Sequence, residues 1–473
     1  MKKKFVFLFS FILIAFFLFN ACAENKGSDK NKTYEPVELF PEPPRPAGQT
    51  DALELRCDPI DTVRIGFIGL GNRGAGAVYR YTFIKGVKIK ALCDLEQWKI
   101  DRAQKTLEKA GLPKADEYTG EDGWKQLCDR DDIDLVYIVT DWRHHTPMAV
   151  YAMEHGKHAV SEVPAAVTID ECWQLVNTVE KTRKHFMQLE NCVYDYFEMA
   201  EHRMADEGVF GEIVHVEGSY IHDLRAHNFE TDEHKGGYWN MWRLKELEKR
   251  NGNTYPTHGF GPLCHILNIH RGDRMDYVVS LSSNQFGMTE YAKKKFGEDS
   301  DFAKRKYKKG DMNTSIIRTA NGKTLMIQHD VTSPRPYSRI QLVSGTKGFA
   351  CKYPVQQIAI DGKHRKGSHL EPLPEDEMNE MLKKYEHPIV TEIGKEAKKV
   401  GGHGGMDFIM DYRLIYCLHN GLPLDQDVYD AAEWSALSEL SEKSVKNHGM
   451  PIKYPDFTRG AWKKLHKVTY YHK

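Results

Sequence analysis

The 473-residue sequence lacks an excess of charge of either sign. Lysine and arginine total 66 against 67 aspartates and glutamates, so the net charge is -1 at pH 7. Nucleic-acid-binding domains usually carry a strongly basic surface, and nothing in this composition marks the chain as one of them. The length corresponds to two or three domains with ample hydrophobic core.

Closely paired cysteines are lacking too. None of the eight cysteines that follow Cys22 stands in a C-x-x-C pair, which leaves zinc ribbons and thioredoxin-like chemistry without support. An exported chain could form disulfides, but Cys93, Cys172 and Cys264 lie in apolar segments, where we expect small buried side chains. No third ligand stands at metal-binding spacing from the His144-His145 pair, so we assign no metal.

One long apolar run is present, at the N-terminus. Lys2–Lys4 precede residues 5–19, and Asn20-Ala21-Cys22 follow. This pattern is typical of a secretory signal and resembles a bacterial lipoprotein signal of residues 1–21, with Cys22 as the lipidated first mature residue. An uncleaved anchor helix is the alternative, but the run is short for a membrane span. The polar, proline-rich segment 22–60 then reads as a tether. We expect an exported lipoprotein, anchored at the periplasmic face or cell surface.

The export route has a consequence for any cofactor. The signal has no twin arginine, which favours a general secretory route for the unfolded chain over export of a folded chain with its cofactor already bound.

A glycine-rich motif follows a β-branched run that begins at Val63. It consists of Gly69, Leu70, Gly71, Asn72, Arg73 and Gly74. In a G-x-G-x-x-G motif between a strand and a helix, the glycines permit a tight turn, close approach of the backbone to a pyrophosphate, and tight helix–strand packing. A second expected strand, 87–93, ends at Asp94, whose carboxylate can accept hydrogen bonds from ribose hydroxyls and would repel a 2′-phosphate. NAD is therefore predicted rather than NADP; the alternative is a glycine-rich structural turn.

Strand and helix patterns continue to alternate up to residue 190. We expect strands over 133–139, 158–161 and 185–190 and helices over 95–110, 147–156 and 168–184. This alternation predicts a parallel, doubly wound sheet, a Rossmann domain of residues 61–190. Ligands of such sheets bind outside the carboxyl ends of the strands, which places Trp142–His145, Glu162 and Asn191 at the edge of the glycine loop. The histidines of the loop 140–145 could instead form a solvated turn.

The pattern changes in residues 191–455, which we take as a second, α+β domain followed by a tail, 456–473. Strand-like runs at 211–223, 275–284, 312–319, 323–331 and 338–344 are separated mainly by turns, which predicts an open, mostly antiparallel sheet. The lysine-rich insert 292–309 reads as a solvated surface segment. The segment 251–262 is rich in glycine and proline, so we expect a loop that carries Tyr255 and His258, either as a site or as incidental turn residues.

Several long stretches resemble one family in particular. They are "GLGNRG" (69–74), "HTPMAVYAMEHGKH" (145–158), "EVPAA" (162–166), "LENCVYD" (189–195), "YPTHGFGP" (255–262), "TSPRPYSRI" (332–340), "GGHGGMDF" (401–408) and "AAEWSALSELSEKSV" (431–445). Together they resemble glycoside hydrolase family 109, the NAD-dependent α-N-acetylgalactosaminidases, within the glucose–fructose oxidoreductase and inositol dehydrogenase superfamily. The resemblance covers most of the chain between residues 60 and 450.

The resemblance implies two sets of contacts. The NAD contacts would be Asn72, Arg73, Asp94, Trp142, Arg143, His144, His145, Glu162, Val163 and Asn191. The sugar contacts would be Tyr220, Arg243, Tyr255, Pro256, Thr257, His258 and Tyr337. From the residues alone, Tyr220 could equally be a core side chain, Arg243 could lie on an amphipathic helix face, and His403 is a weaker candidate.

The chain departs from the related sequences at two places. The family loop T-P-W-x-W-H reads Thr140-Asp141-Trp142-Arg143-His144-His145 here, which could change the shape or polarity of the pocket. The wider superfamily carries a catalytic lysine in E-K-P, whereas this chain has Glu162-Val163-Pro164, which argues against an ordinary sugar dehydrogenase.

The implied reaction is redox-neutral, since NAD-dependent glycosidases are an exception to two-carboxylate hydrolysis. Hydride leaves C3 of the sugar, the C2 hydrogen becomes acidic, the C1 substituent is eliminated, water adds, and the hydride returns. The scheme needs a base near neutrality, and we expect His258 as general base with Tyr255 assisting. Two alternatives remain open: a net NAD-dependent sugar oxidoreductase and an inactive carbohydrate-binding lipoprotein. The expected partner is a glycan or glycoside, with homo-oligomerisation possible.

Overall fold

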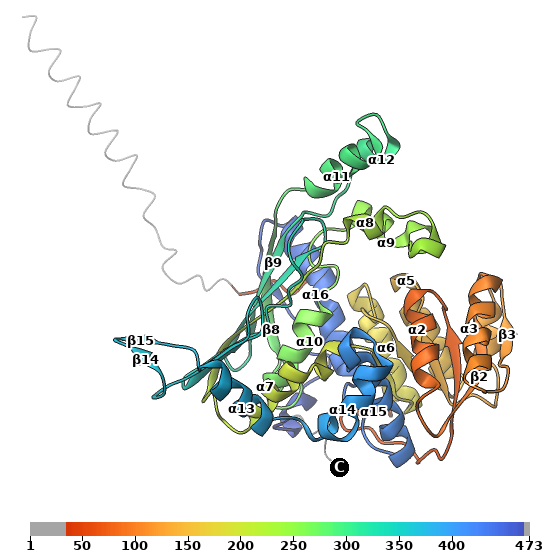
Figure 1. The fold of residues 1–473 in the computed structure, drawn as a ribbon, viewed down its shortest axis with the longest axis horizontal. Coiled ribbons are helices and arrows are strands. Elements are labelled where there is room, and N and C mark those ends of the chain that lie inside the picture. The colour runs from red at the N-terminus through yellow and green to blue at the C-terminus, as the bar shows by residue number, and fades with distance from the viewer. Residues whose placement is uncertain (1–34, 468–473) are drawn as a thin grey trace, which may run out of the picture. The chain divides into compact units, whose positions relative to one another are not determined.

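The computed structural model describes residues 35–467, so the predicted signal and Cys22 lie outside the described residues. Among residues 35–467 no helix combines the length and apolar character that crossing a bilayer requires. From Val37 onward the chain forms one compact unit built on two large sheets (Figure 1). The eight cysteines of the described part are free thiols, and Cys93, Cys172 and Cys264 are buried as expected.

The first sheet confirms the Rossmann prediction. Its six strands are all parallel and run in the order β3-β2-β1-β4-β5-β6. They are β1 (Val63–Ile68), β2 (Val87–Cys93), β3 (Asp116–Tyr118), β4 (Leu135–Ile138), β5 (His158–Ser161) and β6 (Phe186–Gln188). The helices between them are α2 (Asn72–Tyr81), α3 (Gln97–Lys109), α4 (Gly123–Cys128), α5 (Trp142–Glu154) and α6 (Ile169–Thr182). Strand β4 is buried along its whole length, as expected for a sheet covered on both faces.

One predicted loop in this domain is wrong. The segment 142–145 forms the first turn of α5, which begins five residues before Pro147. Asp141 caps the helix, because its side chain accepts a hydrogen bond from the Arg143 amide at 3.1 Å. The proline inside the helix removes one backbone hydrogen bond but does not end the helix.

The second sheet has eight strands in the order β13-β12-β11-β7-β10-β9-β8-β16. They are β7 (Ile213–Ile221), β8 (Met275–Ser282), β9 (Asn313–Thr319), β10 (Thr324–Asp330), β11 (Leu342–Gly345), β12 (Gly348–Cys351), β13 (Gln357–Ile360) and β16 (Ile452–Lys453). All neighbours are antiparallel except β7 and β10, so the sheet is mixed but mostly antiparallel, as predicted.

The two faces of this sheet differ in burial. One row of paired residues across five strands is fully buried: Val278, Ile317, Leu325, Val216 and Val343. The helices α10 (Thr257–Ile266) and α16 (Val428–Lys446) pack against this side of the sheet. The neighbouring row on the opposite face contains Ile316, which is 52% exposed. The alternation follows from the period of two along a strand.

The second domain contains further helices besides α10 and α16. They are α7 (Tyr196–Asp206), α8 (Arg225–Asn228), α9 (Trp242–Lys249), α11 (Gly287–Phe296), α12 (Asp301–Lys304), α13 (Glu375–Lys384), α14 (Pro388–Val400) and α15 (Met406–Asn420). A short hairpin is formed by β14 (Arg365–Lys366) and β15 (His369–Leu370). The lysine-rich insert is not simply a solvated segment: it contains α12 and the end of α11, and Tyr307 and Lys309 are buried. Its alkyl and aromatic groups pack below the charged surface.

Three predicted segment assignments differ from the structure. Residues 37–60 do not form a free tether: Val37 pairs with Ile452, and the Ala52 amide donates to the Tyr429 hydroxyl at 2.8 Å. Residues 456–467 of the predicted tail also belong to the folded body, since Phe457 is fully buried. Helix α15 lies in the predicted second domain but shares a hydrophobic cluster with strands of the Rossmann sheet.

The predicted loop 251–262 is a helix from Thr257 onward, the start of α10. Its glycines serve close packing rather than a turn. A Cβ at Gly259 would lie 2.3 Å from the backbone nitrogen of Ser219, and one at Gly218 would lie 1.8 Å from the Gly259 carbonyl oxygen. Helix α10 and strand β7 therefore touch backbone to backbone, which compensates for the poor helix propensity of glycine.

Candidate active site

The glycine loop has the form that a dinucleotide requires. Gly69 has φ +88°, and a Cβ at Gly74 would lie 2.0 Å from the Gly69 carbonyl oxygen, so the turn and the helix start exclude larger residues at both positions. A Cβ at Gly71 would meet no atom within 4 Å, so the space above this residue is open. Gly71 precedes α2, and no side chain caps the helix. The free amides of a helix N-terminus beside open space suit a pyrophosphate.

Asp94 lies at the carboxyl end of β2, beside the glycine loop. One carboxylate oxygen accepts from the Leu70 amide at 2.6 Å and the other from the Glu96 amide at 3.0 Å. These bonds orient the carboxylate at the place where a ribose hydroxyl would bind, and each oxygen retains a further lone pair. The loop and Asp94 together fit NAD.

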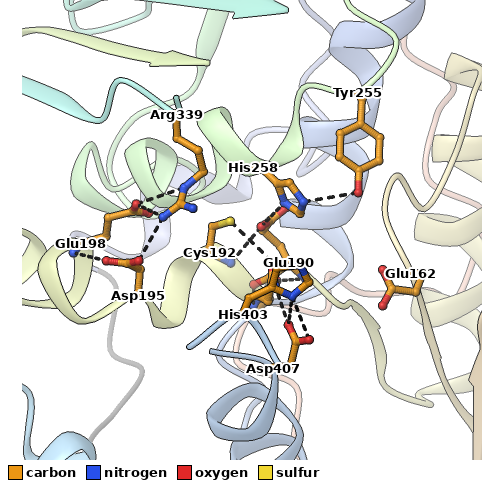
Figure 2. A network of polar contacts seen from close by, with 12 residues as sticks. Glu162, Glu190, Cys192, Asp195, Glu198, Tyr255, His258, Arg339, His403 and Asp407 are labelled. Carbon is orange, nitrogen blue, oxygen red and sulfur yellow. Dashed lines mark hydrogen bonds and ion pairs between the residues drawn. The ribbon is translucent and has the colours of Figure 1, made fainter. Parts of the chain in front are cut away.

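A buried carboxylate that the sequence did not single out organises the predicted cofactor residues. Asp407, at the start of α15, binds Arg73 at 2.7 Å and accepts a hydrogen bond from the Asn191 side chain at 2.5 Å. Arg73 also contacts Glu162 at 2.7 Å (Figure 2 shows Glu162, Asp407 and His403). The exposed His403 ring lies 3.0 Å from Asp407. Although burial opposes it, the positive charges of Arg73 and Arg80 and the hydrogen bond with His403 hold the pKa of Asp407 well below its usual range.

The four residues 142–145 do not share one role. Trp142 is buried and faces Tyr255, with ring centroids 5.7 Å apart. Both ring nitrogens of the buried His145 lie against backbone carbonyls, those of Pro164 at 2.8 Å and Thr140 at 3.1 Å, so His145 joins two loops at the strand ends. Arg143 is half exposed and pairs with Glu246 of α9 at 2.6 Å. Of the four, only Trp142 lies against the ring of Tyr255, one of the predicted sugar contacts.

The departure of this loop from the family pattern has a local explanation. His144 is exposed, and its Nδ1 lies 2.6 Å from the Asp141 carboxylate. The hydrogen bond that the His144 ring donates to the Asp141 carboxylate raises the pKa of His144. The two residues that replace a proline and a tryptophan therefore partner each other, and Asp141 supplies the N-cap of α5.

A histidine–carboxylate pair joins the two domains. His258, in the first turn of α10, places Nδ1 2.7 and 2.9 Å from the two carboxylate oxygens of Glu190, which follows β6 (Figure 2). Nε2 faces the Tyr255 hydroxyl at 3.4 Å. Glu190 is fully buried, whereas the His258 side chain is 14% exposed. The imidazole thus lies at the carboxyl edge of the Rossmann sheet with one nitrogen occupied and the other turned toward the predicted sugar residues.

Aromatic rings and one arginine form a wall around Tyr255 and His258. The Tyr220 ring lies 4.8 Å from Tyr255 and 5.2 Å from His258. The guanidinium of the buried Arg243 lies 4.8 Å from the centre of the Tyr255 ring and 5.2 Å from that of Trp142. Burial and the neighbouring Tyr220 raise the pKa of Tyr255 well above its usual value, so its hydroxyl stays protonated. Such a wall suits the apolar face of a sugar, with donors for its hydroxyls.

The other predicted sugar residues are placed less uniformly. Tyr337 is 40% exposed, and its hydroxyl accepts a hydrogen bond from Arg339 at 3.1 Å. Arg339 is held by Glu198 and Asp195 of the α7 region, as Figure 2 shows. Pro256 occupies the position that precedes α10, and the Thr257 side chain is fully buried. Val163 is buried beside Trp142 in the same hydrophobic cluster.

Glu190, Cys192 and His258 together offer three atoms that lie within 4.8 Å of one another and could hold a metal ion. The 2.7 Å between His258 Nδ1 and Glu190 is a hydrogen-bond distance, whereas two ligands of one tetrahedral zinc lie roughly 3.3 Å apart. The geometry is therefore that of a charge-assisted hydrogen bond.

A segment of the second domain lies over the glycine loop. We define residues 229–241 as the strap. Within it, Glu233 pairs with Lys99 at 2.7 Å, His234 lies 4.2 Å from the Trp98 ring, and the Gly236 carbonyl accepts from Asn72 at 3.3 Å. All three partners belong to the start of α2 or α3, beside the predicted dinucleotide contacts.

Two functional carboxylates were thus missed by reasoning from sequence. Glu190 stands directly before Asn191 at the carboxyl end of a parallel strand, which is a signal that the strand-end rule could have used. Asp407 had no such signal, because its partners Arg73 and Asn191 are more than 200 residues away in sequence.

Comparison with known proteins agrees with this arrangement. Residues 63–189 match the model of the oxidoreductase family with an NAD-binding Rossmann fold, and residues 194–464 match that of the glycosyl hydrolase 109 C-terminal domain. An alpha-N-acetylgalactosaminidase of Bacteroides fragilis is 58% identical over 418 residues, which are 88% of this chain and 97% of that protein. Glycosyl hydrolase family 109 protein 1 of Bacteroides thetaiotaomicron is 50% identical over 454 residues, 94% of this chain and 95% of that protein.

The solved structures show the same fold at low identity. A levoglucosan dehydrogenase in complex with NADH and L-sorbose superposes with a TM-score of 0.62 at 17% identity, covering 84% of this chain and all of that one. A myo-inositol dehydrogenase from Lactobacillus casei in complex with NAD(H) and myo-inositol gives 0.56 at 16% identity, covering 84% and 99% of the two chains. With the family matches, these findings establish that the chain belongs to glycoside hydrolase family 109 and is a glycoside hydrolase with an NAD-binding Rossmann domain.

Proposed function

We propose that the protein removes terminal α-linked N-acetylgalactosamine from glycans and keeps its NAD bound throughout the cycle. The observation that carries this proposal is the grouping of His258, Tyr255, Tyr220 and Arg243 in one wall at the carboxyl edge of the Rossmann sheet. The relative in Bacteroides fragilis, an alpha-N-acetylgalactosaminidase, supports the choice of sugar.

The proposed chemistry leaves no net oxidation. When bound, NAD supplies the acceptor for the C3 hydride of the sugar and returns that hydride at the end. The oxidised C3 makes the C2 hydrogen acidic, and His258 Nε2 takes it as a proton. The electron pair forms a C1–C2 double bond, the C1–O bond breaks, and the departing oxygen takes up a proton. Water then adds, with its oxygen on C1 and a proton on C2.

The wall residues support these steps by position. Tyr255 is held as a neutral hydroxyl next to His258 Nε2, so it can relay a proton or orient a sugar hydroxyl. Tyr220 and Arg243 place donors beside it for an oxygen that becomes negative when C2 is deprotonated. The buried Trp142 and Val163 keep water from this side of the wall.

The test uses purified protein without added cofactor. We expect release of aglycone from p-nitrophenyl α-N-acetylgalactosaminide, with deuterium incorporated at C2 when the reaction runs in D₂O. Retention of the original C2 hydrogen would contradict the elimination step. Accumulation of NADH in proportion to sugar would identify a net oxidoreductase, and tight sugar binding with no turnover would identify an inactive binding protein.

We further propose that the protein is an exported lipoprotein anchored through Cys22. Support comes from the order of Lys2–Lys4, the apolar run and Asn20-Ala21-Cys22 in the sequence. Expressed in a bacterial host, the wild type should incorporate labelled palmitate and sediment with membranes, and Cys22→Ala should do neither. Equal labelling of both chains would contradict the anchor.

A further inference from the structure

Glu190 takes part in the site although it lies too deep to touch the sugar. We propose that Glu190 is a positioning residue: its carboxylate holds the His258 imidazole in the tautomer with the proton on Nδ1, so that Nε2 is the atom that exchanges protons with the substrate. The inference rests on the proposed role of His258.

The contacts on the Nδ1 side favour one tautomer. Both carboxylate oxygens lie within 2.9 Å of Nδ1, and an ionised carboxylate can only accept. Burial alone would raise the pKa of Glu190, but its interactions with His258 and the Cys192 amide outweigh burial, and the pKa lies below its ordinary value, so the carboxylate is ionised. Nδ1 must therefore carry the proton, which leaves Nε2 with a lone pair in the neutral ring.

The contacts on the Nε2 side agree. The Tyr255 hydroxyl, 3.4 Å away, is protonated and can donate to that lone pair. The other groups near the ring have partners elsewhere: the Tyr220 hydroxyl lies 2.9 Å from His222 Nδ1, and the Cys192 thiol donates to the Asn191 side-chain oxygen at 3.5 Å. Nε2 is thus the basic atom, on the side of the predicted sugar residues.

Glu190 itself is firmly held. Its backbone exchanges two hydrogen bonds with the Gln426 side chain, at 3.3 and 2.9 Å, and its Oε1 accepts from the Cys192 amide at 3.0 Å. A Cβ at Gly261 would lie 3.1 Å from Glu190 Cγ, so helix α10 packs directly on the side chain. Such a support fixes the ring orientation as well as its tautomer.

These contacts define what an amide would do at this position. In Glu190→Gln the Cys192 amide needs an oxygen at the Oε1 position, 2.7 Å from His258 Nδ1, so the new NH₂ group takes the Oε2 position, 2.9 Å from the same nitrogen. One of the two acceptors facing Nδ1 thereby becomes a donor and the negative charge is lost, so the preference for a proton on Nδ1 weakens and the tautomer with the proton on Nε2, the wrong one for a base, gains population. Removal of the orienting carboxylate from a histidine–carboxylate pair lowers turnover by about 10²–10⁴-fold.

The experiment compares Glu190→Gln, Glu190→Asp and the wild type as full-length proteins. We expect kcat for the α-N-acetylgalactosaminide to fall by about 10²–10⁴-fold in Glu190→Gln while KM and bound NAD per chain stay near the wild-type values. Glu190→Asp retains the charge and should lose less. The matched control is Glu433→Gln, another buried carboxylate beside a histidine, His270 at 3.4 Å, which should keep wild-type kcat.

A second readout does not depend on turnover. In proton NMR, the strongly hydrogen-bonded Nδ1 proton of His258 should give a downfield resonance in the wild type that is absent from His258→Ala and is lost or shifted upfield in Glu190→Gln. A resonance that survives unshifted in Glu190→Gln, or wild-type kcat in that variant, would overturn the inference. If the wild type itself cleaves no glycoside, the proposed function fails, and the resonance alone still decides the role of Glu190.

Discussion

His258 is the side chain that connects Glu190 of the first domain with Tyr255 of the second, and its replacement by alanine removes the proposed base without touching the glycine loop. We expect turnover to fall by about 10²–10⁴-fold, the usual contribution of a general base. Bound NAD should remain, because Gly71 and Asp94 are unaffected. Steady-state kinetics and mass spectrometry of the unsupplemented protein measure the two effects. Near-normal turnover would leave His258 as a structural residue of α10.

At the scale of elements, the strap over residues 229–241 joins the second domain to the rim of the dinucleotide site. Glu233 and His234 contact Lys99 and Trp98, and the Lys99 side chain is only 6% exposed. A partly buried ion pair and a ring contact together contribute about 1–2 kcal/mol. The double variant Glu233→Gln/His234→Ala should therefore release NAD about ten times faster, as measured by capture of the released cofactor.

The strap offers its own control. Lys235 has an exposed side chain that pairs only locally, with Asp232 at 3.3 Å, so Lys235→Ala should leave the release rate of NAD unchanged. An unchanged rate in the double variant would show that the strap does not retain the cofactor.

Strands β5 and β6 contain a pH-dependent contact. His158 Nδ1 accepts from the His185 amide at 2.9 Å, and burial, with the nearby His185 and Lys184, lowers the pKa of His158 to about 3. The neutral ring therefore stabilises the fold fully above the unfolded pKa of about 6.5, and this contribution is lost as the pH falls toward 3. His158→Asn keeps an acceptor but does not titrate. This variant should be less stable than the wild type at pH 7.5. The difference between the two proteins in the free energy of unfolding should shrink by about 1.4 kcal/mol per pH unit below 6.5, because only the wild type loses stability there. Urea unfolding at several pH values tests this; a constant difference would contradict it.

The sequence predicted those elements whose pattern lies within a short stretch of residues, and it did not predict those that depend on contacts with distant residues. The G-x-G-x-x-G motif, Asp94 and the strand–helix alternation lie within short windows, and the Rossmann sheet followed from them. Helix α10 did not, because Gly259 and Gly261 lower helix propensity locally and are explained only by their contacts with Ser219, Glu190 and Trp434. The same holds for Glu190 and Asp407, whose roles come from partners on the other domain.

On the scale of the whole molecule, the two sheets are joined through helices rather than through strands. Helix α16 packs against both α6 of the Rossmann domain and β8 of the second sheet, and Glu190 and His258 meet across this junction. The active site therefore depends on the packing of the two domains. Its parts, residues 69–74, 190, 258 and 407, are far apart in the sequence and come together only in the tertiary structure.

The outer face of the second sheet carries the last prediction. The row opposite the buried one consists of Val279, Ile316, Met326, Glu217 and Leu342, which is apolar except for one glutamate, and Ile316 is 52% exposed. An exposed apolar row on a broad sheet favours self-association. We therefore expect the soluble chain without its signal to form a homo-oligomer in light scattering after size exclusion. Ile316→Glu should shift it toward the monomer, because an interface between two copies of this face would bury a glutamate from each copy, and the two negative charges would repel each other. Leu112→Glu, at an exposed leucine of the first domain outside this sheet, is the matched control and should leave the mass unchanged. A wild-type chain that is monomeric at every concentration would exclude this face as an interface between copies.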